Sequence, residues 1–296
     1  MISLEQILDK LEKATLLGNK EVIIDKLVQL EDLKNSNELA WCSEKNQEKL
    51  ANLHAGNVIC STHTSKNYLK EGINYILCEN PRLVFKEIIE HFFVEKTIRY
   101  AVAPSAKISS TAKISDKVRI GENCVIEENV VIGENSEIGH NTVIHKGTVI
   151  GRNVKIGSNN TIGGVGFGYV KEKDGSYSLI HHIGNVIIED YVEIGNNTCI
   201  DRAVLGSTLI CKNAKIDNLV HIAHGVIVGE NSLIIANSMI GGSSKIGKNC
   251  WVAPSASVIN KNITGNNVTI GMGAVVIRDI PDDDVVAGNP AKSIRK

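Results

Sequence analysis

Aromatic residues and net charge are both scarce in this chain. Of its 296 residues only 4% are aromatic, and 32 Lys and Arg nearly balance 33 Asp and Glu, which gives a net charge of −1. A core poor in Phe and Trp must be built from aliphatic side chains, and Ile and Val dominate here. A charge near zero provides no general attraction to nucleic acid or to an anionic membrane, so we expect neither as a partner.

Cysteine pairs and long apolar runs are also missing. The seven cysteines are odd in number, widely spaced and without a C-x-x-C pair, which argues against a disulfide framework and against a zinc site. Reduced thiols indicate a cytoplasmic protein. The amino-terminal segment is amphipathic and mixed in charge, unlike a signal peptide. No apolar stretch approaches the ~20 residues that cross a bilayer, so we expect no transmembrane segment.

A period of six residues runs through most of the chain. Ile or Val recurs at every sixth position over 102–162, over 188–200 and, after a four-residue slip, over 210–276, with Thr264 as the exception. A helix has a period of 3.6 and a strand a period of two, so neither explains this pattern. Six residues per face fit a triangular solenoid of stacked parallel strands. We therefore predict a mainly β fold, a left-handed parallel β-helix of hexapeptide repeats.

The repeat divides the chain into three parts. Residues 1–98 lack it and mix helix signals with short apolar runs, which predicts a small amino-terminal α/β domain. Residues 99–280 are the predicted β-helix. Residues 281–296 begin with Pro281 and an acidic run, so we expect a carboxy-terminal tail. The repeat fails at 163–187 and at 201–210, and insertions in solenoids often emerge as loops that line a binding site.

The segment 216–225 is the strongest candidate for chemistry. Acyl transfer to an amine needs a base with a pKa near neutral, and His224 is a residue of that type. Gly242 lies one coil after His224, where a missing side chain would leave a groove, and Arg202 lies one coil before it. Backbone N–H groups or an Asn side chain could bind the oxyanion. The alternative is that His224 is an ordinary solvated residue at a coil edge.

Three segments resemble a known family. The stretches 166–169 (GFGY), 184–210 and 215–231 are similar to the UDP-3-O-acylglucosamine N-acyltransferases of lipid A synthesis, and the first domain is similar too. The resemblance implies a homotrimer with active sites between neighbouring β-helices. It implies that His224 is the general base, that Asp217 supports it, and that Asn218 helps the reacting carbonyl.

The resemblance also implies the substrates. The family transfers a 3-hydroxyacyl chain from acyl carrier protein to the 2-amino group of a UDP-linked 3-O-acylglucosamine, and its amino-terminal domain stacks the uracil on aromatic residues. The donor would be an acyl carrier protein or coenzyme A thioester, and we expect no permanently bound cofactor and no metal. The substrate-binding residues that we predict are Trp41, Phe167, Tyr169, His181, His182, Arg202, His221, Gly242, Asn260 and Asn262.

Three departures keep other functions open. Lys261 and Asn262 follow the segment 256–260, where the resemblance implies a second active-site histidine, and Gln47 stands where a tyrosine is expected. The chain also ends like the coenzyme A-dependent sugar acetyltransferases. One alternative is therefore an acetyl-CoA-dependent N-acetyltransferase that modifies a nucleotide-linked amino sugar for surface polysaccharide. A non-catalytic β-helix scaffold or binding module is the other, because fold alone does not establish function.

Overall fold

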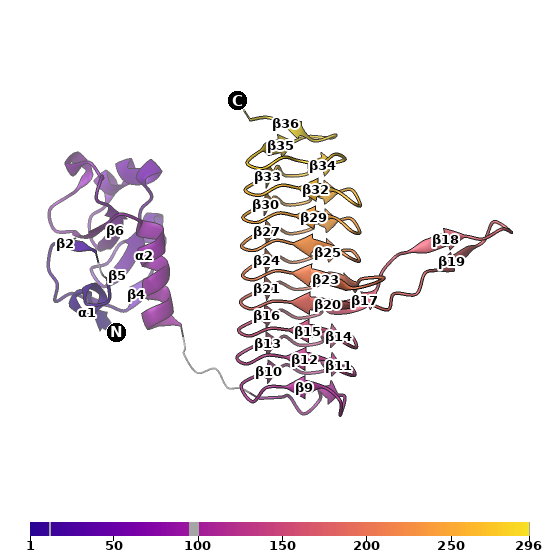
Figure 1. Ribbon diagram of the computed structural model, residues 1–296. Coiled ribbons are helices and arrows are strands. Elements are labelled where there is room, and N and C mark those ends of the chain that lie inside the picture. Colours follow the sequence, from indigo (N-terminus) through magenta and orange to yellow (C-terminus); the bar gives the residue numbers. More distant parts are fainter. Residues whose placement is uncertain (12, 95–100, 296) are drawn as a thin grey trace. The chain divides into compact units, whose positions relative to one another are not determined.

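The chain divides into two compact units, Met1–Ile98 and Arg99–Lys296. The computed structural model describes residues 1–11, 13–94 and 101–295 (Figure 1). The predicted domain boundary at 98/99 lies outside the described residues.

The first unit is a five-stranded sheet with helices. Its strand order is β2-β7-β6-β5-β4, parallel except for β2, and the strand β6 is buried along its whole length. Helix α2 begins at Pro81, where the Asn80 side chain accepts a hydrogen bond from the Leu83 N–H at 3.1 Å and caps the first turn. The elements of this unit are β1 Ile2–Ser3, α1 Leu4–Leu8, β2 Thr15–Leu17, β3 Ile23–Ile24, β4 Lys26–Leu27, η1 Leu30–Asp32, β5 Glu38–Trp41, η2 Glu44–Asn52, β6 Asn57–Ser61, η3 Lys66–Tyr68, β7 Asn74–Cys78, α2 Pro81–Ile88 and η4 Ile89–Phe93.

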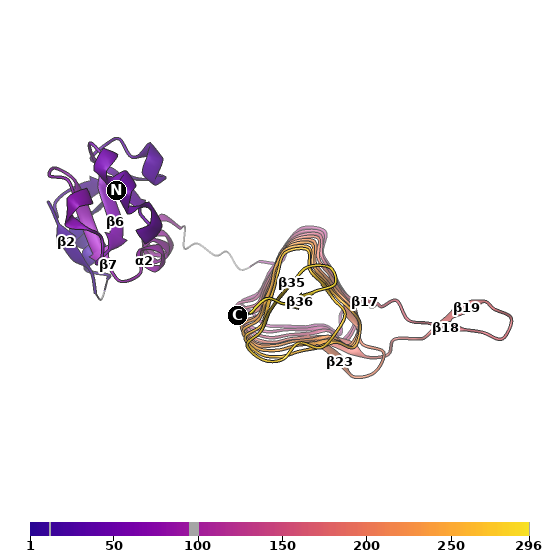
Figure 2. The same ribbon diagram turned by 90° about the horizontal axis from the view of Figure 1, so that it is seen from above.

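The second unit is a parallel β-helix with a triangular cross-section (Figure 2). Short strands stack in three sheets, and a typical pair such as Arg119↔Glu137 joins the same position of two successive coils. From Ile120 onward the aliphatic anchors are buried and form one continuous core, while Ile108 and Ile114 are partly buried against it and Val102 is exposed. Because each coil buries its apolar side only against its neighbours, the repeat is the source of stability. The predicted β-helix is confirmed.

The three sheets are named by their number of strands in the described residues. The ten-strand sheet contains β10 Arg119–Ile120, β13 Glu137–Ile138, β16 Lys155–Ile156, β21 Glu193–Ile194, β24 Lys215–Ile216, β27 Leu233–Ile234, β30 Trp251–Val252, β33 Thr269–Ile270, β35 Val285–Ala287 and β36 Lys292–Ser293. The nine-strand sheet contains β8 Lys107–Ile108, β11 Val125–Ile126, β14 Val143–Ile144, β17 Thr161–Val165, β22 Cys199–Arg202, β25 His221–Ile222, β28 Met239–Ile240, β31 Ser257–Val258 and β34 Val275–Val276. The eight-strand sheet contains β9 Lys113–Ile114, β12 Val131–Ile132, β15 Val149–Ile150, β20 Asn185–Ile188, β23 Ser207–Ile210, β26 Ile227–Val228, β29 Lys245–Ile246 and β32 Ile263–Thr264.

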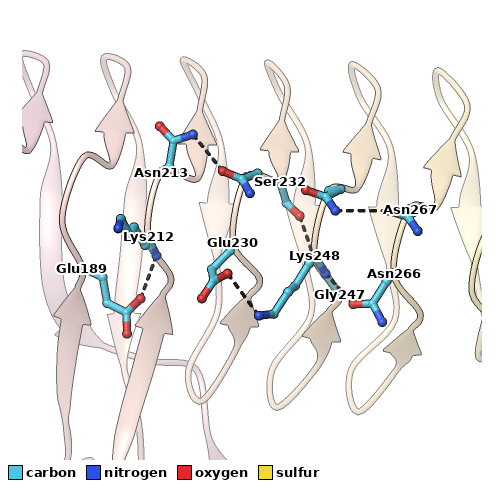
Figure 3. Close-up of polar contacts among 11 residues, drawn as sticks. Glu189, Lys212, Asn213, Glu230, Ser232, Gly247, Lys248, Asn266 and Asn267 are labelled. Atoms are coloured by element: carbon cyan, nitrogen blue, oxygen red, sulfur yellow. Dashed lines mark hydrogen bonds and ion pairs between the residues drawn. The ribbon is translucent and has the colours of Figure 1, made fainter.

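Asparagines form a ladder at one corner of the prism. Between the eight-strand and ten-strand sheets, Asn213, Asn231, Asn249 and Asn267 all adopt a positive φ, which asparagine tolerates better than most residues (Figure 3). Asn213 Nδ2 donates to Asn231 Oδ1 at 2.8 Å, and Asn249 Nδ2 donates to Asn267 Oδ1 at 3.1 Å. These four residues define the ladder corner.

The segment 281–296, expected to be a tail, is joined to the β-helix. Strand β35 pairs in parallel with β33 through Thr269↔Val285 and Ile270↔Val286, and β36 pairs with β35 in the antiparallel sense. Val286 is buried and belongs to the core of the β-helix. The segment therefore closes the end of the hydrophobic core.

Both interruptions of the repeat emerge at a single corner, between the nine-strand and eight-strand sheets. The long one connects β17 to β20 and contains the hairpin of β18 Tyr169–Lys171 and β19 Tyr177–Leu179, which projects outward from the prism (Figures 1 and 2). The short one connects β22 to β23 and lengthens its coil, so that Cys199 pairs with His221. We call this edge the loop corner.

Candidate active site at the loop corner

His224 lies at the loop corner, immediately beside both insertions. It follows β25 in the nine-strand sheet and precedes β26 in the eight-strand sheet. The two insertions are hydrogen-bonded to each other, because the N–H of Ile183 donates to the Val204 carbonyl at 3.0 Å and that of Asn185 to the Gly206 carbonyl at 3.0 Å. The repeat therefore brings a histidine and two irregular segments, distant in sequence, to one edge.

Gly242 makes room for the His224 ring itself. A Cβ at Gly242 would lie 2.7 Å from His224 Nε2 and 2.8 Å from Cε1, closer than side chains pack. The sequence predicted that this glycine would leave a groove beside His224. The structure instead places the imidazole over the glycine, so the glycine determines where the ring can lie.

His182 forms the second wall of the site. The residue is 6% exposed, and its ring stands edge-on to that of His224, with the ring centroids 5.2 Å apart and the planes at 78°. A Cβ at Gly166 would lie 3.0 Å from both His182 Nε2 and His224 Cβ, and one at Gly168 would lie 3.0 Å from His182 Cε1. The glycines of the GFGY stretch are thus required for the chain to pass this close to the two rings.

Asp201 supplies the carboxylate of this site, a residue that the sequence reasoning left without a role. Its side chain is 14% exposed, and Oδ2 lies 3.7 Å from His221 Nε2. Burial raises the pKa of Asp201, while His221, His224 and His182 act to lower it. The register of the lengthened coil could have identified Asp201 from the sequence. Because that coil is four residues longer, Asp201 lies one coil before the residue that follows Ile222.

The surroundings of His224 favour the neutral imidazole over the cation. Burial lowers the pKa of His224 below its ordinary value, His182 lowers it further, and the charge of Asp201 opposes both. A neutral imidazole can accept a proton, and the negative charge of Asp201 then favours the resulting cation. This combination is what a general base requires.

Arg202 turns inward and supports the long loop. The residue is 5% exposed, and Nε donates to the Gly163 carbonyl at 2.6 Å, beneath the start of the insertion. The contact seen for Arg202 is thus with the chain's own backbone, although the sequence predicted a substrate contact.

Asp217 and Asn218 lie at the opposite edge of the nine-strand sheet. Asp217 Oδ1 accepts from the Asn218 backbone N–H at 2.7 Å and from Asn218 Nδ2 at 2.9 Å, and Oδ2 accepts from the Ala236 N–H at 3.2 Å. Both residues line a groove of about 700 Å³ over the ten-strand sheet. Within the part of the chain that the structure describes, no hydrogen bond or ion pair joins either residue to His224. The support that the resemblance implies for His224 therefore does not come from Asp217 of the same chain.

The other predicted binding residues fall into three groups, two of which are the long loop and the first unit. Phe167 is 86% exposed and contacts Tyr169 with the ring centroids 4.9 Å apart, and both belong to the long loop at the site, as does the exposed His181. Trp41 belongs to the first unit, where its ring lies 6.4 Å from that of Phe85.

Asn260 and Asn262 lie two coils beyond His224. Asn260 is exposed, at the position one coil above Gly242. Asn262 is 2% exposed, its Nδ2 donates to the Arg278 carbonyl at 2.7 Å, and its Oδ1 accepts from Thr264 Oγ1 at 2.8 Å. Asn262 thus satisfies backbone and side-chain partners inside the coil instead of facing a ligand.

In residues 1–11, 13–94 and 101–295, no group of three or more His, Cys, Asp or Glu is arranged to hold a metal ion. None of the helices in the same residues combines the length and the apolarity needed to cross a bilayer.

Known proteins similar to this chain are acyltransferases. A family model described as bacterial transferase hexapeptide (six repeats) matches residues 129–164. A UDP-3-O-acylglucosamine N-acyltransferase of Campylobacter curvus is 45% identical over 271 residues, which cover 88% of this chain and 85% of the relative. A Campylobacter lari protein of the same name is 43% identical over 129 residues, and there the match spans only 40% of the relative's length.

A solved structure supports the β-helix architecture. The UDP-N-acetylglucosamine acyltransferase of Francisella novicida has a TM-score of 0.60 and 28% sequence identity, and the match covers 65% of this chain and 68% of that protein.

Proposed function

Since the chain belongs to the family of UDP-3-O-acylglucosamine N-acyltransferases, we propose that it transfers an acyl group from a thioester donor to the amino group of a nucleotide-linked amino sugar. The proposed acceptor is UDP-3-O-(3-hydroxyacyl)glucosamine of lipid A synthesis. The observation that carries this proposal is the half-buried ring of His224, held over Gly242 at the loop corner where both insertions meet.

In this proposal His224 is the general base. The amine nitrogen attacks the thioester carbonyl, a C–N bond forms, and the amine proton passes to the His224 imidazole. The C–S bond then breaks, and the imidazolium returns the proton to the sulfur, which leaves as a thiol. Asp201 stabilises the intermediate imidazolium, so its negative charge favours the step in which His224 is protonated.

The proposed assembly is a homotrimer with sites between neighbouring chains. Large apolar side chains are exposed around the loop corner, and an exposed apolar patch commonly marks an interface: Val165, Phe167, Ile183 and Leu205 are 57%, 86%, 76% and 73% exposed. In a cyclic trimer, the edge with His224 in one chain can meet the edge with Asn218 in the next. Such a site would bring together His224 and Asn218, which lie on opposite edges of the nine-strand sheet within one chain.

Mixed trimers test this arrangement. His224→Ala and Asn218→Ala chains, inactive alone, are co-assembled in equal amounts. If each site takes His224 from one chain and Asn218 from its neighbour, every mixed trimer contains one intact site, and activity returns to about one quarter of that of the unaltered enzyme. A site built within one chain would restore nothing.

The proposed donor is an acyl carrier protein or coenzyme A thioester, with no permanently bound cofactor, and the proposed location is the cytoplasm. Purified protein is offered 3-hydroxyacyl carrier protein or acetyl-CoA, with UDP-linked amino sugars, and the products are weighed. N-acylation by the carrier protein supports the lipid A reaction. Acetylation from acetyl-CoA would instead indicate the surface-polysaccharide type of enzyme.

His224→Ala tests the chemistry directly. Loss of a general base is expected to lower turnover by ~10²-fold or more, with the unfolding temperature and the assembly unchanged. An unchanged rate would remove His224 from the mechanism. No transfer from either donor, in the unaltered chain, would favour a binding or scaffold protein.

A further inference from the structure

His182 is a buried histidine with one unused nitrogen. The residue is 6% exposed, and Nδ1 lies 2.7 Å from the Ile180 carbonyl oxygen. Because a carbonyl only accepts, Nδ1 must carry the hydrogen, and Nε2 of the neutral ring is left as an acceptor. Nε2 is buried and has no hydrogen-bond partner, the one such side-chain atom in the described residues. An unpaired buried polar atom destabilises a fold, so an aliphatic residue would fill this place at lower cost.

The unpaired nitrogen lies against the proposed base. His182 Nε2 and His224 Cβ would both lie 3.0 Å from a Cβ at Gly166, so the backbone there confines the two rings on one side. Gly242 confines the His224 ring on another side. The two imidazoles therefore share one small space between the backbone at Gly166 and the backbone at Gly242, and they meet edge to face.

We propose that His182 is a positioning residue for His224: it fixes the orientation of the His224 ring, and the space they share does not accommodate both rings as imidazolium cations. This inference rests on the proposed function, because it assigns to His182 the task of keeping the general base unprotonated until the amine proton arrives. It identifies a second histidine of the site within the insertion, where the six-residue period gives no guidance.

The surrounding charges agree with this task. Asp201 interacts electrostatically with both rings, and His221 lies on the other side of this interaction, with its Nε2 3.7 Å from Asp201 Oδ2. Arg202 directs its Nε to the Gly163 carbonyl, beneath the loop. Two positive rings about 5 Å apart in a water-poor space repel each other strongly. The influence of His182 on its neighbour is accordingly to lower the pKa of His224.

The experiment follows the titration of His224 without using enzyme turnover. Diethyl pyrocarbonate acylates neutral imidazoles, so the rate of modification of His224 against pH, followed by mass spectrometry of peptides, gives its titration midpoint. The exposed His63 in the same digest is the internal reference. His182→Leu removes both ring nitrogens, whereas His182→Asn keeps a donor for the Ile180 carbonyl but cannot be protonated.

Both variants are expected to raise the His224 midpoint by about half a pH unit, which is roughly a threefold loss of neutral His224 on the acid side. They are also expected to lower kcat more than they change KM. If His182 only fills space, His182→Asn and His182→Leu will leave the midpoint where it is, and the inference is overturned. Because the modification needs no enzyme turnover, a failed proposed function would leave this measurement intact.

Discussion

The ladder corner and the loop corner occupy equivalent places in the same solenoid, yet they are built in opposite ways. At the ladder corner the polar groups are paired: asparagine amides bond along the stack, and Lys248 Nζ lies 3.0 Å from Glu230 Oε2 (Figure 3). At the loop corner the period fails, and His182 keeps a buried nitrogen unpaired. The comparison indicates that the regular corner stabilises the fold. The irregular corner contains a locally destabilising group, as functional sites often do.

The largest effects on stability and activity are expected from substituting one glycine at each corner. A Cβ at Gly247 would overlap the Gly265 carbonyl oxygen, so Gly247→Ala must push two coils apart. We expect it to lower the free energy of unfolding by about 2–4 kcal/mol. A Cβ at Gly242 meets only the His224 ring among its nearest atoms. Gly242→Ala should therefore displace the ring and lower kcat by ~10²-fold, with little change in unfolding.

Denaturant unfolding measures the free energy of unfolding of both glycine variants, and steady-state kinetics measures their kcat. Equal losses of stability would contradict the distinction between the two corners. A Gly242→Ala enzyme with normal kcat would show that the position of the His224 ring over the glycine is not needed.

A weaker effect is expected from the carboxylate at the loop corner. Asp201 raises the pKa of His224, so Asp201→Asn should lower that pKa and move the acid limb of kcat/KM to lower pH. The imidazolium also loses its counter-charge, so kcat should fall by about tenfold. The pH profile is measured beside that of Glu230→Gln, a matched loss of a carboxylate at the ladder corner. If the acid limb of Asp201→Asn moves upward, the assigned role of Asp201 is wrong.

Much of the fold was predictable because each coil repeats the same physical demand. An aliphatic residue at every sixth position must point inward, and a step of one regular coil from His224 led directly to Gly242. The roles of Asp201 and His182 were not predictable in this way. Asp201 belongs to the coil that the short insertion lengthens, so counting by the regular coil length does not bring it next to the residues around His224. His182 lies in the long insertion, and the path of that insertion depends on tertiary contacts. Asp217 was placed beside His224 by resemblance, whereas one chain puts the two residues on opposite edges of a sheet.

The smallest effect should come from breaking one step of the asparagine ladder. Asn249 has a φ of 56° and donates to Asn267 Oδ1 at 3.1 Å in an exposed position. Asn249→Gly keeps the backbone conformation and loses only this bond, so we expect unfolding to become easier by about 0.5 kcal/mol. Asn249→Ala also forces a Cβ into the left-handed conformation, which should bring the loss to about 1–2 kcal/mol. Activity should be unchanged in both variants, because the ladder corner stabilises the coil and contains no residue of the proposed active site. A fall in kcat in Asn249→Gly, at a temperature where it remains folded, would mean that the two corners are coupled through the core and that stability and chemistry are not separated in this solenoid.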